Sequence, residues 1–234
     1  MLDHVFEKMN RLVAFRFNLF GYELEIGNTI FVTWIIMAVL IALALVFTRG
    51  MSYGKPGKLQ VVTEFFVETV SNICKDSIGS HYKAYVPYIG TLLLYLGLAN
   101  IIAVFNFIPG VEIVPPTKDI NVTGSLAVIS IMVVLYSGFR RKGFIGWVKS
   151  LADPMPLMIP FKLMEYGTKP LSLCLRLFGN VVASFIIMEL LLAFIPLLGS
   201  PFSAYFDLFD GILQAYIFIY LTTIYIGEAV ETES

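Results

Sequence analysis

The sequence predicts an all-α polytopic membrane protein with about five transmembrane helices and one amphipathic surface helix. Of its 234 residues, 58% are hydrophobic and only 14% are charged, and the mean hydropathy is +0.81. A soluble domain typically has about 25% charged residues. Several apolar runs reach or approach the roughly 20 residues that span ~30 Å of hydrocarbon, where the backbone must satisfy its own hydrogen bonds. We therefore expect residues 1–234 to form a single helical membrane domain.

The N-terminal part of the chain contains one clear span. Residues 1–27 carry charges throughout and no long apolar run, so we expect an external N-terminal segment and not a cleaved signal peptide. The apolar run 28–48 predicts the first transmembrane helix, which ends at Arg49 and a turn rich in Gly and Pro. Residues 59–79 alternate polar and apolar side chains at helical spacing, which predicts an amphipathic helix on a membrane face.

Four more apolar segments follow in the chain. The next two predicted spans cover residues 84–108 and 121–139. A long helix over 161–195 and a last helix over 202–228 are joined by PLLGSPF, whose Gly and Pro residues predict a tight turn and hence an antiparallel hairpin. Four prolines within residues 151–170 predict an irregular interfacial stretch before this hairpin.

The positions of lysine and arginine predict the orientation. Basic residues gather after the first span, at positions 49–83, and after the third span, at positions 140–149. Cytoplasmic loops carry such an excess of Lys and Arg. We therefore place the N-terminus outside and the acidic C-terminus, GEAVETES, in the cytoplasm.

The composition also excludes several function classes. A net charge of -1 lacks the basic footprint of a protein that binds nucleic acid. No loop has the spacing of a nucleotide-binding P-loop. The two cysteines, Cys74 and Cys174, lie in separate helical segments without metal-ligand spacing, and His4 and His81 have no ligand companions. We expect no cofactor and no metal.

A single arginine, Arg176, lies within the apolar run LSLCLRLFGNVVASFIIMELLLAFI. An arginine at bilayer depth costs about 2.5 to 3.5 kcal/mol or more, so it normally faces protein or water and has a partner. Glu189 follows 13 residues later, ~20 Å along a helix, which is too far for an ion pair. We therefore expect the opposing carboxylate on another chain; partial snorkelling to the cytoplasmic end is the competing interpretation.

Polar and small residues share the predicted helix face with Arg176. Ser172 lies four residues before it and Asn180 four residues after it, and the small residues Gly179 and Ala183 lie beside them on this face. Small residues let another helix approach closely, which favours a partner surface. The alternative is that these residues pack against the chain's own helices.

Polar residues on the last helix recur near three- and four-residue intervals. Asp207, Asp210 and Gln214 lead this series, with Thr222 and Tyr225 further on. Intramembrane acids at such spacing would line a hydrated path for a proton or a small cation. The alternative is that Asp207 and Asp210 cap the start of the helix, since Asp is a good N-cap residue. Gln214 is deeper and does not fit that alternative.

Two sequence blocks resemble subunit a of the membrane sector of F-type ATP synthase. KPLSLCLRLFGN, residues 169–180, is followed on the last helix by LQAYIFIYLTTIYIGEA, residues 213–229, in the order that the family has. PTKDINVT, residues 116–123, is similar to the block before the family's third span. The resemblance covers most of the chain from about residue 84.

The resemblance implies a stator that conducts H+ or Na+ and is not an enzyme on its own. It implies a c-ring, b subunits and the rest of the ATP synthase as partners, lipid around the chain, and a bacterial inner membrane as location. Arg176 matches the essential arginine that opposes the rotor carboxylate between two offset half-channels. Further matches to polar or acidic positions of the ion path are Asn180, Gln214, Asp207, Asp119 and Glu165, with Asp210 as an additional acid.

The chain departs from the family at one position. Nine residues after the arginine, where the family often has an acid or a histidine, stands Phe185. Glu189, one turn further on, is the candidate substitute. Two functions from other classes remain as alternatives: a secondary ion transporter that acts alone, and a scaffold that conducts no ions.

Overall fold

In the part of the chain that the computed structural model describes, six helices follow a short β-hairpin. The structure describes residues 13–19, 22–49, 57–102, 115–151, 155–194 and 196–230. Within these ranges the side chains of residues 13–28, 144, 145, 148, 151, 156, 185, 188, 189, 191–194 and 196–207 are not described. The helices are α2 (Asn28–Thr48), α3 (Lys58–Ile78), α4 (Val86–Ile101), α5 (Ile120–Leu151), α6 (Ile159–Phe194) and α7 (Pro196–Val230). The connections described between them contain the short 3₁₀ turns η1 (Gly79–Ala84), η3 (Pro116–Lys118) and η4 (Pro156–Met158).

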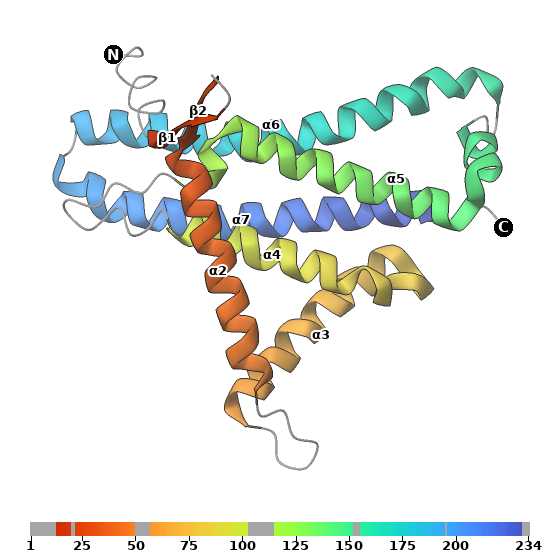
Figure 1. Ribbon diagram of the computed structural model, residues 1–234, viewed down its shortest axis with the longest axis horizontal. Helices are drawn as coiled ribbons and strands as arrows, with labels where there is room; N and C mark the ends of the chain where they lie inside the picture. The colour runs from red at the N-terminus through yellow and green to blue at the C-terminus, as the bar shows by residue number, and fades with distance from the viewer. Residues whose placement is uncertain are drawn as a thin grey trace.

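The helical architecture confirms the predicted fold class. α4 to α7 run along the long axis of the molecule, and α2 crosses them (Figure 1). Among the described residues, α2, α5 and α7 contain stretches long and apolar enough to cross a membrane. A fourth span is possible if α3 and α4, which meet at a bend of 119°, count as one broken span. The crossing by α6, which corresponds to the predicted span 161–195, stays a prediction.

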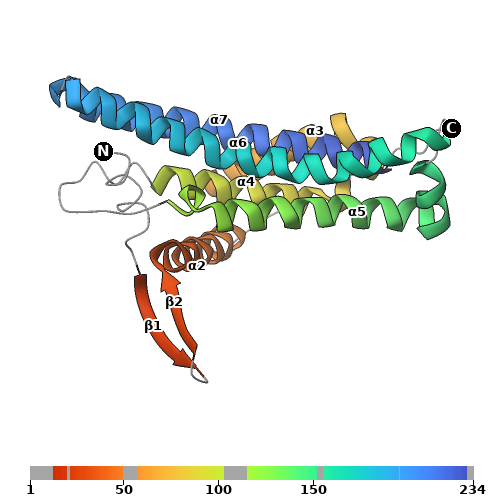
Figure 2. The same ribbon diagram turned by 90° about the horizontal axis from the view of Figure 1, so that it is seen from above.

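The N-terminal hairpin is an element that the sequence analysis missed. β1 (Val13–Leu19) pairs antiparallel with β2 (Tyr22–Gly27), and Arg16 is the register partner of Glu25. The hairpin projects beyond α2, away from the other helices (Figure 2). The alternation of large apolar residues in VAFRFNL and YELEIG is the strand signal that could have found it.

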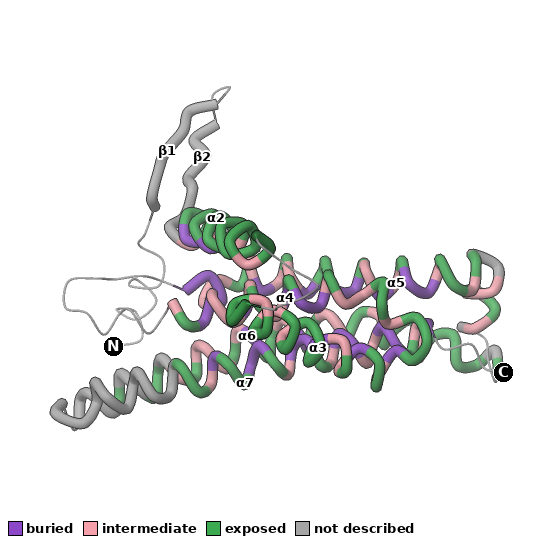
Figure 3. Tube along the Cα trace, turned by 90° about the horizontal axis from the view of Figure 1, so that it is seen from below, coloured by how far each residue is buried: buried purple, intermediate pink, exposed green. Residues whose placement is uncertain are grey.

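The core lies between α4, α5, α6 and α7. Leu96, Leu173, Leu177, Phe218 and Ile219 are each at most 2% exposed and belong to one cluster. The buried residues follow the inside of this bundle, while the outside of α2 is almost entirely exposed (Figure 3). A helix that is apolar all round and exposed in the isolated chain is typical of contact with lipid.

α3 is amphipathic, as its pattern predicts, and packs against α4 and α7 through its last two turns. Val70, Cys74 and Ile78 are buried at four-residue spacing, and the first half of the helix is largely exposed. Gly79, with φ of 72°, ends the helix and starts the bend toward α4. α7 approaches so closely that a Cβ on Gly227 would lie 2.2 Å from the carbonyl oxygen of Ser77. Only glycine fits there without movement of the backbone.

α4 and α5 differ in extent from their predicted spans. α4 is helical from Val86 to Ile101, shorter than the predicted 84–108, whose last residues lie outside the described ranges. α5 passes its predicted end at residue 139 and continues through the basic residues to a break at Gly143, which has φ of 67°. Charged residues end a membrane span, but they do not end a helix that can continue in water.

α6 and α7 form the predicted antiparallel pair and lie side by side in Figure 2. The prediction of a tight turn over PLLGSPF is wrong, because these residues form the first turns of α7. Proline is suited to the first helical position, since its missing N–H has no partner there anyway, and Pro196 occupies it. The irregular stretch expected over 151–170 is also shorter than predicted, since α6 begins at Ile159 and contains Pro170.

The lengths of α6 and α7 bear on how they can lie in a bilayer. With 36 and 35 residues, they are each roughly 53 Å long at ~1.5 Å per residue. The hydrocarbon core is only ~30 Å thick. If both helices stay within it, they must be strongly inclined to the bilayer normal. α2, itself a candidate span, crosses them (Figure 1), as expected if α2 lies closer to the normal than they do.

Candidate functional site

Arg176 lies at the middle of α6 and points out of the bundle. It stands 17 residues after Ile159 and 18 before Phe194. Its neighbours Leu173 and Leu177 are at most 2% exposed in the core, whereas Arg176 itself is exposed. None of the described side chains forms a hydrogen bond or an ion pair with it. The guanidinium is therefore available to a group outside this chain.

The helix face around Arg176 is open as well. Ser172, Leu175, Gly179 and Ala183 are exposed. Their exposure favours a surface open to a partner over packing against the chain's own described helices, and Ser172, Gly179 and Ala183 make much of that surface small. Such a surface allows a neighbouring helix to approach the arginine closely.

Asn180 lies one four-residue step after Arg176, at the edge of the open face, where it is less exposed than Ser172 and Arg176 and turns toward α7. Each four-residue step on a helix advances by about 40°, so Asn180 is turned by about 40° from Arg176 and about 80° from Ser172. Asn180 is half-buried against α7, where its Nδ2 donates to Oδ1 of Asp210 at 2.5 Å and to Oε1 of Gln214 at 3.4 Å.

Asp210 is the centre of a polar cluster between α6 and α7, here called the Asp210 cluster and made of Asn180, Ser184, Asp210 and Gln214. Its second carboxylate oxygen accepts from Oγ of Ser184 at 3.4 Å. Gln214 is only 4% exposed, and its Nε2 has no hydrogen-bond partner among the described residues. The Asp210 carboxylate can take up and release a proton or a small cation, and the unused N–H of Gln214 can donate to a water or an oxygen ligand beside it.

α4 and the 3₁₀ turn η3 border this site on a further side. Asn100 on α4 donates through Nδ2 to the carbonyl oxygen of Gly211 at 2.9 Å and accepts through Oδ1 from Oγ1 of Thr117 at 2.9 Å. Sequence reasoning missed Asn100 and Thr117. A polar residue within the apolar run 84–108 is a signal that could have found Asn100, because burying an amide in a span is costly.

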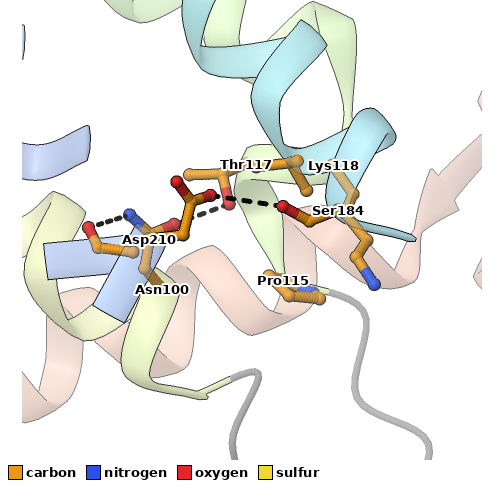
Figure 4. Close-up of a pocket in the computed structure, with 8 residues that line it drawn as sticks. Asn100, Pro115, Thr117, Lys118, Ser184 and Asp210 are labelled. Atoms are coloured by element: carbon orange, nitrogen blue, oxygen red, sulfur yellow. Dashed lines mark hydrogen bonds between the residues drawn. The ribbon is translucent and has the colours of Figure 1, made fainter. Parts of the chain in front are cut away.

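A small pocket opens beside Asp210 (Figure 4). Its walls come from α4, from the segment around η3, and from the facing parts of α6 and α7. The lining residues are Asn100, Pro115, Thr117, Lys118, Val181, Ser184, Asp210 and Gly211. The pocket therefore gives the Asp210 cluster an opening toward the η3 side of the molecule.

A charged cluster lies toward the other end of the α6–α7 pair and is here called the Lys169 cluster. Nζ of Lys169 is 2.7 Å from Oε1 of Glu165 and 2.6 Å from Oε2 of Glu228. The same ammonium lies 4.8 Å from the ring centroid of Tyr225. Lys169 precedes Asn180 by 11 residues, roughly 16 Å along α6. Arg176 lies between the two clusters in the sequence of α6, on its outer face.

The family model of the ATP synthase A chain matches residues 30–227. The chain belongs to this family. The match begins in α2, ends in α7 and includes every residue of both clusters except Glu228, which lies one residue beyond its end. This confirms the resemblance found in the sequence. A chain of this family is a non-catalytic, multi-pass membrane component of ATP synthase.

In this A-chain family member, Asp119 has a structural contact at the start of α5. Its Oδ1 accepts from the backbone N–H of Asn121 at 2.9 Å, the position of an N-cap side chain. Its Oδ2 accepts from Oγ1 of Thr29 at 2.9 Å, which ties α2 to α5. Asp119 therefore stabilises the helix start; a place in an ion path stays a prediction for it.

The alternative that Asp207 and Asp210 cap the last helix is wrong. α7 begins at Pro196, so these acids are its twelfth and fifteenth residues. The side chains of Asp207, Glu189 and Phe185 lie outside the described residues. Their places in the site of this A-chain family member stay predictions. The described part of the chain contains no group of three or more His, Cys, Asp or Glu side chains that could hold a metal ion.

Proposed function

We propose that this chain is the ion-conducting stator of a rotary ATP synthase. H+ or Na+ would pass between the two sides of the membrane and the carboxylates of a c-ring through two offset half-channels. The observation that carries the proposal is the position of Arg176, exposed and unpaired among the described side chains, between two polar clusters of the α6–α7 pair.

The proposed role of Arg176 follows from its chemistry. A guanidinium stays protonated at any working pH, so it cannot pass a proton on. It can attract the ionised carboxylate of a rotor subunit and repel cations. A rotor carboxylate can face Arg176 in its charged form, but it must be neutralised before it enters lipid, because an unpaired charge in hydrocarbon is costly. Arg176 would thus stop ions from passing directly between the half-channels.

The two clusters are the proposed ends of these half-channels. We assign the Asp210 cluster to the outer half-channel, with Asp207, Glu189 and Asp119 as further candidate residues. We assign Glu165 and the rest of the Lys169 cluster to the cytoplasmic half-channel. Their separation of roughly 16 Å along α6 gives the offset that the mechanism needs. Between them, Leu173, Leu177 and Phe218 pack as an apolar barrier.

The proposed contact surface for the c-ring is the open face of α6 and α7. Leu171, Leu175, Ile187, Ile212 and Tyr216 are each at least 49% exposed. In the assembled complex this apolar surface would meet rotor helices, and the exposed surface of α2 would meet lipid. The b subunits are the further partners that family membership suggests.

The proposed location is a bacterial inner membrane, with the N-terminus outside and the C-terminus in the cytoplasm. The distribution of lysine and arginine supports this orientation. The Lys169 cluster then lies toward the cytoplasmic side, next to the basic segment at the end of α5.

Reconstitution of the purified chain tests this proposal against the transporter alternative. We expect vesicles that contain the chain alone to show no ion flux, because the rotor carboxylates that carry the ions are absent. Vesicles with the chain and the c-ring, measured with a pH-sensitive dye and with a Na+-sensitive dye, are expected to conduct one of the two ions. Saturable flux through the chain alone would support a secondary transporter instead.

A further inference from the structure

Asn100 joins three elements at the level of Asp210. It lies in the last turn of α4 and is 6% exposed. Its amide donates to α7 at Gly211 and accepts from Thr117 of η3, which is 1% exposed (Figure 4). Both bonds measure 2.9 Å, and we call this pair of bonds the Asn100 bridge.

Gly211 makes the bridge possible. A Cβ at this position would lie 2.6 Å from Cβ of Asn100, closer than side chains approach each other. The carbonyl oxygen of Gly211 has two lone pairs, so it can accept from Asn100 in addition to its bond within the helix. α4 and α7 therefore meet at the residue next to Asp210, and they meet through a hydrogen bond and not through apolar packing alone.

The bridge fixes α7 from the side opposite α6. On the α6 side, Asp210 accepts from Asn180 and from Ser184. Because Asp210 and Gly211 are adjacent, a shift or rotation of α7 that breaks one set of bonds also disturbs the other. A displacement of ~1 Å is enough to impair a transfer step that depends on geometry.

We propose that Asn100 is a positioning residue for the ion path. The Asn100 bridge holds α7 in the register and rotation that keep the Asp210 carboxylate within hydrogen-bond reach of Asn180 and beside the pocket. Asn100 acts through Asp210 and does not itself carry the ion. This inference rests on the proposed function of the Asp210 cluster.

The test uses the assembled ATP synthase in inverted membrane vesicles, with ATP-driven pumping measured over a range of pH. Loss of one buried hydrogen bond corresponds to a change of about three- to tenfold. Asn100→Ala and Thr117→Val are each expected to lower pumping per assembled complex by this factor. They are also expected to shift the pH profile by about half a unit or more, since the surroundings of Asp210 change. Thr117→Ser keeps the hydroxyl and is expected to behave like the parent.

Ser130→Ala is the matched control. Ser130 on α5 is 1% exposed, and its hydroxyl lies 3.1 Å from the hydroxyl of Tyr88 on α4, the helix that also carries Asn100. The substitution therefore removes a comparable buried hydrogen bond away from Asp210. We expect this variant to keep the parental pH profile. If Asn100→Ala prevents assembly, Thr117→Val and Asn100→Asp, which keeps the acceptor and loses the donor, carry the comparison.

The outcomes separate the inference from the function on which it rests. Variants of Asn100 and Thr117 that match Ser130→Ala in pH profile would overturn the positioning role. The positioning role would also be overturned if Asn100→Ala shifted the pH profile equally in a complex that already carries Asp210→Asn, because the shift would then not depend on Asp210. If Arg176→Ala keeps coupled pumping, the proposed function itself fails, whatever the Asn100 variants do.

Discussion

Arg176→Ala is expected to abolish ATP synthesis driven by an ion gradient. The substitution removes the charge that opposes the rotor carboxylate, and a desolvated charge without its partner costs about 3–5 kcal/mol, which corresponds to a loss of about a hundredfold or more. Synthesis is measured in vesicles with a fixed amount of assembled complex. Passive ion leak through the membrane sector is expected to rise, because the barrier between the half-channels is gone.

Two further variants make this result specific. Arg176→Lys keeps a charge but loses the planar fork of donors, so we expect it to restore little of the coupled activity. Arg140→Ala removes an exposed arginine at the end of the apolar stretch of α5 and is expected to leave synthesis intact. Normal coupling in Arg176→Ala, with the complex fully assembled, would contradict the stator mechanism.

Asp210→Asn is expected to slow ion flux by about tenfold or more, the scale of a lost proton-transfer group. Asparagine has nearly the same shape and can still accept from Asn180, so the packing of α6 on α7 should persist. The carboxylate, however, would no longer take up and release an ion. Flux is measured as ATP-driven pumping and as passive conduction after removal of the catalytic sector.

Asp76→Asn is the control for this second variant. Asp76 is an exposed acid of α3, and no part of the proposed path contains it. Its substitution is expected to leave flux unchanged. If flux also stays unchanged in Asp210→Asn, the outer half-channel does not pass through the Asp210 cluster, and Asp207 and Glu189 become the acids to substitute next.

The apolar pattern predicts most of the helices, because burial in lipid demands long apolar runs with internal hydrogen bonds. It does not predict where helices end. Gly143 breaks α5 through a positive φ, four residues after the expected end, and Pro196 begins α7 where a turn was expected. Such ends depend on local backbone conformation, which hydropathy does not report.

For the candidate site, too, the sequence predicts some residues and misses the contacts that depend on packing. Arg176 and Gln214 stand out in the sequence because each is a polar residue in an apolar helix. The pairing of Asn180 with Asp210, and the bridge from Asn100 to Gly211, depend on the rotation of packed helices, which no single segment determines. Asn100 and Gly211 are 111 residues apart in the chain. Family resemblance did not supply them either, since it rests on the blocks at 116–123, 169–180 and 213–229.

Cross-linking tests the central claim most directly: that Arg176 faces a carboxylate of the rotor. Leu175 is 51% exposed on the same face of α6, so Leu175→Cys places a thiol next to the arginine. Single cysteines are then introduced at successive positions along the carboxylate-bearing helix of subunit c, and disulfide formation with each is measured in the membrane. We predict cross-links that peak at the level of the rotor carboxylate. Cross-links that are absent at every position, in a complex that assembles and turns over, would contradict the account.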